Sequence, residues 1–184
     1  MLFTQLDLAG AYLIEVEPHR DNRGFFARTF CKRDFLDHGL DATITQCSAS
    51  FNHRRGTIRG MHYQIAPHEE AKVVRCTAGR VFDVIVDVRP ESPTHAQWRG
   101  VELTSRNHRM LYIPAGFAHG FQTLEDNSEI FYQMSTEYVP SANRGIRWND
   151  PALAINWPIK GEITISEGDA NLPGVYSGGR AGDV

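Results

Sequence analysis

Several polar side chains fall inside segments that otherwise have the residue pattern of β-strands. They are Arg59, His62, Gln64, Lys72, Asp83, His119 and Tyr132. A histidine accepts and releases protons near neutral pH, a tyrosine hydroxyl donates one, and a lysine or arginine stabilises negative charge on oxygen. One such residue alone is more often structural. Together they indicate a polar cavity that could bind one ligand and move a proton.

The segments around these residues show the alternation of strands rather than the period of helices. In residues 80–88, Phe82 and every second residue after it would lie on one face, with Asp83 on the other. A tight Ala-Gly turn separates this segment from residues 71–77, which predicts a hairpin. Further strands are expected at 11–17 and 24–30, which flank a turn, and in QWRGVEL, RMLYIPAG, GFQTLE and SEIFYQMST.

Helical periodicity is scarce, and its best example is KRDFLDHGL at residues 32–40, which ends at Gly39. The pattern therefore predicts a mainly all-β fold with a few short helices, an antiparallel β-barrel or jelly roll. The length of 184 residues suits a single domain over residues 1–184. Its end, from about residue 174, is expected to be a loosely ordered tail.

Composition and charge exclude several classes of protein. A net charge of −3 disfavours a nucleic-acid binder, which usually carries a basic excess. No apolar stretch approaches the ~18 residues that span a bilayer, and the N-terminal residues do not have the pattern of a signal peptide. The three cysteines are widely spaced and without a C-x-x-C pattern. We expect a reduced, cytoplasmic protein with no membrane partner and no structural zinc.

One motif bears on a possible metal site. PAGFAHGF, at residues 114–121, matches the P-x-G-x-x-H element of the cupin superfamily of small jelly-roll barrels. Metal-binding cupins add an H-x-H pair and a glutamate, but here Gln64 stands where the second histidine would be. An amide is a poor ligand for zinc or iron, so only His62, His119 and Glu69 remain. We predict no metal, and keep a metal-dependent cupin oxygenase as a weaker alternative.

A longer series of motifs resembles one family. DNRGFF, GTIRGMHYQ, AKVVR, GRVFDVIVDVRPESPT, LYIPAGFAHGFQTL, GIRWNDP and SEGD occur in order between Asp21 and Asp169. Together they resemble the dTDP-4-dehydrorhamnose 3,5-epimerase family of metal-independent cupins. The resemblance implies a cupin-like barrel that needs no cofactor. It also implies inversion of one or two carbons beside the 4-keto group of a nucleotide-linked 6-deoxysugar, and a homodimer in which residues near Arg23 reach the partner's site.

The reaction needs a base, a charge stabiliser and an acid on the opposite face of the sugar ring. His62 suits the base, because its ordinary pKa of about 6.5 makes it a reversible proton acceptor. Lys72 suits the developing enolate oxygen, and Tyr132 suits the acid. The resemblance implies that Asp169 orients His62. Asp83 on a neighbouring strand is the alternative partner, and the sequence leaves the choice open.

The resemblance also implies the residues that hold the nucleotide. Arg23 and Arg59 match phosphate-contacting arginines, and a guanidinium forms bidentate contacts with phosphate. Tyr138 matches an aromatic side chain that stacks on the nucleobase. The other substrate-binding positions implied are Phe26, Arg28, Gln46, Ser48, His119 and Asn143.

Arg59 and His62 are three residues apart, so a regular strand would place them on opposite faces. We hypothesise a bulge at Gly60 that brings both to the cavity. The chain departs from the family pattern at Arg28, Ser48, Asn143 and Gly168. Because these departures fall among substrate-contacting positions, a different sugar, a CDP- or GDP-linked substrate, or inversion at one carbon only stays open. So does a sugar- or nucleotide-binding module without turnover.

Overall fold

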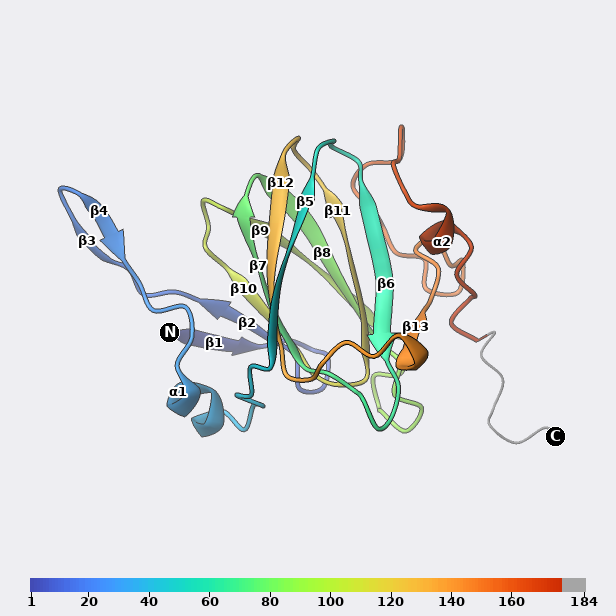
Figure 1. The fold of residues 1–184 in the computed structure, drawn as a ribbon, viewed down its shortest axis with the longest axis horizontal. Helices are drawn as coiled ribbons and strands as arrows, with labels where there is room; N and C mark the ends of the chain where they lie inside the picture. Colours follow the sequence, from blue (N-terminus) through green and yellow to red (C-terminus); the bar gives the residue numbers. More distant parts are fainter. Residues whose placement is uncertain (177–184) are drawn as a thin grey trace.

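The computed structural model describes residues 1–176, and most of its strands lie in two antiparallel sheets (Figure 1). The first sheet has the order β1 (Leu2–Gln5), β2 (Tyr12–Glu15), β10 (Met110–Ile113), β7 (Lys72–Ala78), β12 (Ser128–Met134) and β5 (Gln46–Asn52). The second has the order β13 (Asn143–Gly145), β6 (Ile58–Gln64), β11 (Phe117–Thr123), β8 (Arg80–Asp87) and β9 (Trp98–Thr104). The predicted mainly-β, antiparallel jelly-roll class is confirmed.

Few elements lie outside the two sheets. A hairpin of β3 (His19–Asp21) and β4 (Gly24–Phe26) projects from the body on the side opposite α2 (Glu167–Ala170), as Figure 1 shows. The short helix α1 (Lys32–Asp37) lies within the predicted helical segment, and a 3₁₀ turn covers Pro140–Ala142. The predicted tail falls mainly on residues 177–184, outside the described residues. No helix within residues 1–176 is long and apolar enough to cross a membrane.

The apolar core between the sheets explains why their strands are so rich in aliphatic residues. Val74 and Leu111 from the first sheet pack with Ile85 and Phe121 from the second. The opposite face of β8 is also buried, because Val84 and its neighbours pack against the C-terminal segment. A strand buried on both faces has a nearly continuous apolar sequence, as residues 80–88 do.

The predicted hairpin between residues 71–77 and 80–88 is wrong. β7 pairs with β10 and β12 in the first sheet, whereas β8 pairs with β11 and β9 in the second. Gly79 between them has φ +70°, and a Cβ there would lie 2.4 Å from Ser128 Oγ. The turn residues that indicated a hairpin therefore serve a tight corner at which the chain changes sheets.

The expected strands at 11–17 and 24–30 also need correction. β2 is shorter than predicted and pairs with β1 and β10. The segment that starts at Gly24 is strand only as far as Phe26, and it pairs with β3, which lies inside the predicted turn. The projecting hairpin is therefore separate from the barrel sheets.

Asp87 ties the end of β8 to the following loop. Its carboxylate is fully buried and accepts hydrogen bonds from Arg89, Ser92 and Thr94. Burial alone would raise the pKa of Asp87, but these hydrogen bonds outweigh it and lower the pKa to about 2. The depressed pKa stabilises the fold above the ordinary value of about 3.8, and this stabilisation is lost as pH falls towards 2.

We therefore expect Asp87→Asn to make the protein less sensitive to acid. In the wild type the linked contribution is about 2 kcal/mol at neutral pH. Urea unfolding at pH 6 and at pH 3 should show a smaller loss of unfolding free energy in the variant than in the wild type. An equal loss in both proteins would show that Asp87 is not a source of the acid sensitivity.

Candidate active site

A cavity of about 600 Å³ opens between the two sheets, a size suited to one small-molecule ligand. Four of the five predicted catalytic residues line it, namely His62, Lys72, Tyr132 and Asp169. Six of the predicted substrate contacts line it as well: Gln46, Ser48, Arg59, His119, Tyr138 and Asn143. The barrel thus gathers residues that lie up to 123 positions apart in the sequence, from Gln46 to Asp169.

The hypothesised bulge at Gly60 is present. His119 of β11 lies opposite His62, and Phe121 lies opposite Arg59, so two residues of β6 face the single residue Gly120. Gly60 has φ +117°, and a Cβ there would lie 2.6 Å from the Cα of Gly120. Only glycine fits this close approach. Because of the bulge, both Arg59 and His62 reach the cavity.

The carboxylate that contacts His62 is that of Asp169. His62 Nε2 lies 2.8 Å from Asp169 Oδ1, and the Gly60 N–H donates to Oδ2 at 3.0 Å. Burial raises the pKa of Asp169, but the hydrogen bonds from His62 and Gly60 outweigh it, so the pKa is lowered. An ionised Asp169 favours a proton on Nε2, which leaves Nδ1 of His62 with its lone pair for a substrate.

Asp83 does not contact His62, so the alternative pairing is wrong. The fully buried carboxylate of Asp83 lies 2.9 and 3.0 Å from Nε2 of His119 instead. His119 is 4% exposed and stands beside His62 across the β6–β11 ladder. Both cavity histidines are therefore paired with an aspartate: the His62–Asp169 pair is partly open to solvent, whereas the His119–Asp83 pair is buried and only its histidine lines the cavity.

Tyr132 lies on the first sheet, and His62 on the second. The two side chains therefore approach the cavity from opposite walls. The Tyr132 ring packs edge-to-face on His119, with ring centroids 5.9 Å apart. Burial, and then the charge of Asp83, raise the pKa of Tyr132, while Arg59 acts in the opposite direction. Tyr132 is consequently a neutral phenol that can donate its proton.

Lys72 is paired with a carboxylate that sequence reasoning missed. Its Nζ lies 2.9 Å from Glu70 Oε1, and the two side chains are only 11% and 10% exposed. Glu70 precedes Lys72 by two residues, so an extended backbone points both to the same side. This spacing of two residues is the sequence signal from which the Glu70–Lys72 pair could have been predicted. The pair leaves a localised ammonium in the cavity wall.

Two glutamine side chains hydrogen-bond to the backbone of the segment at the outer part of the cavity. Gln46 Oε1 accepts a hydrogen bond from the backbone N–H of Tyr138 at 2.7 Å, which fixes Tyr138 at the rim. Gln64, where metal-binding cupins have a histidine, is buried and points elsewhere. Its amide donates to the carbonyls of His68 and Glu137 and accepts from the N–H of Val139. Gln64 thus supports the segment that bears Tyr138.

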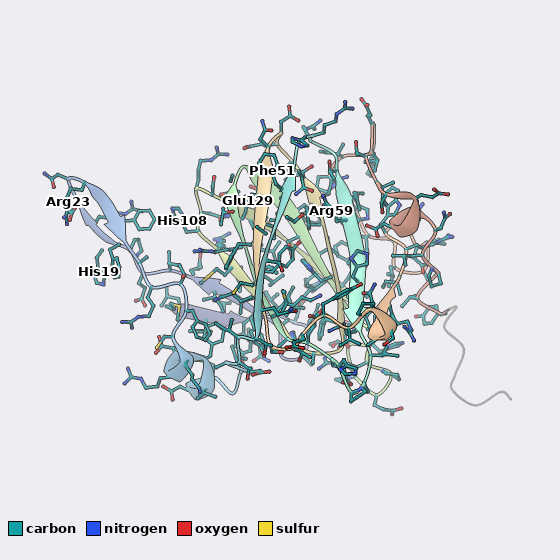
Figure 2. All side chains as sticks on the ribbon, viewed as in Figure 1. His19, Arg23, Phe51, Arg59, His108 and Glu129 are labelled. Carbon is teal, nitrogen blue, oxygen red and sulfur yellow. The ribbon has the colours of Figure 1, made fainter. Side chains whose placement is uncertain are left out.

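Three predicted substrate contacts lie away from this cavity. Arg23, Phe26 and Arg28 belong to the projecting hairpin or directly follow it, and all three are exposed. Figure 2 shows Arg23 near the tip of the hairpin, far from Arg59 on β6. The Arg23 guanidinium contacts Asp21 of the same hairpin. A single chain does not bring these residues to its own cavity.

Within residues 1–176, no group of three or more His, Cys, Asp and Glu side chains is arranged to hold a metal ion. The Nε2 atoms of His62 and His119 each contact an aspartate. Glu69, the third weak candidate, does not line the cavity. The donor set in this cavity is therefore suited to proton transfer more than to coordination.

A jelly-roll barrel whose cavity holds a histidine–aspartate pair, a lysine and a partly buried tyrosine defines a cupin-like protein equipped for acid–base chemistry. Comparison with known proteins makes the class specific. The family profile of dTDP-4-dehydrorhamnose 3,5-epimerase matches residues 5–176. The chain belongs to this family.

Individual relatives agree with the profile. The dTDP-4-dehydrorhamnose 3,5-epimerase of Sinorhizobium fredii is 40% identical over 94% of this chain and 89% of its own length. The crystal structure of dTDP-6-deoxy-D-glucose-3,5-epimerase from Legionella pneumophila, in complex with dTDP-4-keto-L-rhamnose, superposes with TM-score 0.90 at 34% identity and covers 96% and 93% of the two chains. A 3'-monoepimerase from Streptomyces bikiniensis, in complex with dTDP-quinovose, has TM-score 0.86 at 33% identity and covers 92% and 86%.

Proposed function

We propose that the protein inverts C3, C5 or both carbons of a nucleoside-diphosphate 4-keto-6-deoxysugar, as in the conversion of dTDP-4-dehydro-6-deoxyglucose to dTDP-4-dehydro-L-rhamnose. The supporting observation is the placement of His62 and Tyr132 on opposite walls of one cavity. Inversion requires a proton to leave one ring face and return to the other. The Legionella relative that binds dTDP-4-keto-L-rhamnose supports the same substrate class.

Removal of the proton, stabilisation of the enolate and return of a proton fall to different side chains. His62 removes the proton on the carbon next to the ketone, so that the C–H electron pair forms a C=C bond and the carbonyl π pair moves onto oxygen to give an enolate. The ionised Asp169 stabilises the imidazolium that results. The Lys72 ammonium stabilises the enolate oxygen, and electrostatic stabilisation of this kind is worth about 3–4 kcal/mol in enzymes. Tyr132 then donates its proton to the opposite face of the carbon.

The nucleotide would occupy the rest of the cavity. Arg59 supplies N–H donors for the diphosphate, and Tyr138 offers an exposed ring at the rim for the nucleobase. Gln46, Ser48, His119 and Asn143 complete the polar lining. We also propose that the reaction takes place in the cytoplasm as a step in the synthesis of polysaccharide precursors, and that it needs no cofactor.

The test of this function is an assay of 4-keto-6-deoxysugars linked to dTDP, CDP and GDP. NMR in deuterated water should show solvent deuterium entering at C3, C5 or both, together with inverted product. The dTDP substrate should turn over fastest. Exchange without inversion would support a different reaction, and absence of both exchange and inversion with all three substrates would leave a binding module. A metal-dependent oxygenase would instead require stoichiometric bound iron or manganese and consume oxygen.

Inversion at a single carbon is the second candidate. The monoepimerase from Streptomyces bikiniensis has nearly the same fold, so the fold does not determine the number of centres. Two of the departures from the family pattern, Ser48 and Asn143, line the cavity. Gly168 adjoins Asp169 on α2, and a Cβ there would meet only Ser166 Oγ, at 3.9 Å. These positions are where a change of substrate or of stereochemical outcome would originate.

We further propose a homodimer in which the β3–β4 hairpin enters the partner's cavity. Phe25 and Phe26 on this hairpin are 43% and 75% exposed, and aromatic side chains on a projecting hairpin favour burial against another surface. A guanidinium delivered by Arg23 would add a second cation for the diphosphate.

Mixing a weakened variant with an inactive one tests this arrangement. We expect Arg23→Ala to be weakened through loss of phosphate binding, and His62→Ala to be inactive. After mixing and subunit exchange, a heterodimer has one cavity with both residues intact, so activity should rise well above the sum of the separate variants. Arg20→Ala, on the same hairpin, mixed with His62→Ala serves as a control. No recovery after verified exchange would contradict sharing of the site.

A further inference from the structure

Asn52, the last residue of β5, makes three hydrogen bonds with one side chain. Its Oδ1 accepts from Arg59 Nε at 2.8 Å, and its Nδ2 donates to the carbonyls of Ser50 at 3.1 Å and Ser128 at 3.2 Å. The residue is 2% exposed. Because both Nδ2 protons are used by backbone carbonyls, only the oxygen of the amide can face Arg59. The amide is therefore a fixed acceptor on a rigid strand.

This contact joins the two sheets beside the cavity. Asn52 belongs to the first sheet and Arg59 to the second, directly before the bulge at Gly60. Arg59 has a long, flexible side chain that loses rotamer entropy when it is fixed. A hydrogen bond to Nε fixes the plane of the guanidinium and leaves Nη1 and Nη2 for a ligand.

The position of this guanidinium also affects the residues of the proposed proton transfer. For Asp169, burial raises the pKa and the hydrogen bonds from His62 and Gly60 lower it, and the charge of Arg59 adds to this lowering. For Tyr132, the same charge opposes the rise in pKa that burial and Asp83 cause. A displaced Arg59 would lose its alignment with a diphosphate and weaken its effect on both groups. Arg59 therefore needs a fixed position, and among residues 1–176 Asn52 is the side chain that hydrogen-bonds to it.

We propose that Asn52 is a positioning residue that orients Arg59 for the diphosphate of the nucleotide sugar. The proposal rests on the proposed function of Arg59. Asn52 itself does not line the cavity, so it acts through the arginine and not on the substrate. Asn52 holds the guanidinium of Arg59 in its binding orientation before the ligand arrives. Such preorganisation improves affinity because less side-chain freedom is lost on binding.

A double-mutant cycle on ligand binding tests this role. Calorimetric titration with dTDP and with thymidine, which lacks phosphates, is carried out on the wild type, Asn52→Ala, Arg59→Ala and the double variant. We expect Asn52→Ala to weaken dTDP binding about tenfold, the size of one hydrogen bond to a charged group, and to leave thymidine binding unchanged. The double variant should bind dTDP like Arg59→Ala alone.

Three results would overturn the proposal. Losses for dTDP that add in the double variant would mean that Asn52 acts independently of Arg59. Equal weakening of thymidine and dTDP would indicate general damage to the cavity. If Arg59→Ala binds dTDP like the wild type, the assigned role of Arg59 fails first, and the inference fails with it.

A matched control tests whether the effect is specific to Asn52, and a second variant replaces Asn52→Ala if that protein does not fold. Phe51→Ala changes the neighbouring residue of the same strand, whose side chain is 45% exposed, and should leave dTDP binding unchanged. Should Asn52→Ala fail to fold, Asn52→Gln replaces it in the cycle. The longer amide keeps the donors and the acceptor but displaces the guanidinium, so a selective loss of dTDP affinity is again expected.

Discussion

Replacing His62 with alanine is expected to abolish both epimerisation and the exchange of solvent deuterium into the sugar. The variant keeps Lys72 and Tyr132 but has no base within reach of the acidic C–H. General-base catalysis is worth about 10²–10⁴-fold, and loss of a base that acts together with an oriented carboxylate belongs at the upper end of that range. Proton NMR in deuterated water, with the integrals at C3 and C5 followed separately, measures both processes.

The control for this experiment is His53→Ala, which removes an exposed histidine directly after β5. It should exchange and epimerise at wild-type rates. Exchange retained at both carbons in His62→Ala would remove His62 from the role of base. Exchange retained at one carbon only would require a second base, and the buried His119 beside Asp83 is the side chain in position to supply it.

Motifs along the chain predicted which residues line the cavity better than they predicted which of those residues contact one another. His62, Lys72 and Tyr132 could be selected because polar side chains in apolar strands are costly unless they serve a site. The partner of His62 could not be selected, because Asp83 and Asp169 are both carboxylates that a fold could bring close. The answer depends on α2 packing beside β6, a contact between residues 107 positions apart.

Strand pairing was misjudged where local and tertiary preferences differ. The Ala-Gly turn before β8 has the local chemistry of a hairpin, but β7 and β8 each bury apolar residues with other partners. Pairing in a jelly roll is set mainly by such contacts between distant segments, which turn residues do not encode. Gly79 reports only that the chain bends sharply there.

Residues that support other site residues escaped notice for a related reason. Asn52 is the last residue of β5 and Glu70 lies two residues before β7, positions where a polar residue is normally solvated. Their partners are set by the fold: Glu70 faces Lys72 inside the cavity, and Asn52 meets Arg59 across two sheets. Such side chains are recognised by low exposure combined with a contact to a charged site residue, and neither property is visible in a single sequence.

Replacing Tyr132 with phenylalanine is expected to separate inversion from exchange. His62 can still remove a proton, trade it with solvent and return a deuteron to the same face, so wash-in continues with the original configuration. Inversion needs a donor on the opposite wall, where Tyr132 lies on β12. Because burial and the charge of Asp83 raise the pKa of Tyr132, the wild-type phenol stays protonated throughout the neutral and mildly alkaline range.

We expect epimerisation by Tyr132→Phe to fall about 10²–10³-fold, with a clearly smaller loss in deuterium wash-in. Both rates come from one NMR time course on the same sample, so their ratio is independent of enzyme concentration. Tyr138→Phe is the matched control: it removes a hydroxyl at the rim of the same cavity and should leave the ratio unchanged.

Equal losses in the two rates would mean that the second proton comes from another group. In that case the role of Tyr132 would be structural: its ring packs edge-to-face on His119 and holds the buried imidazole in place.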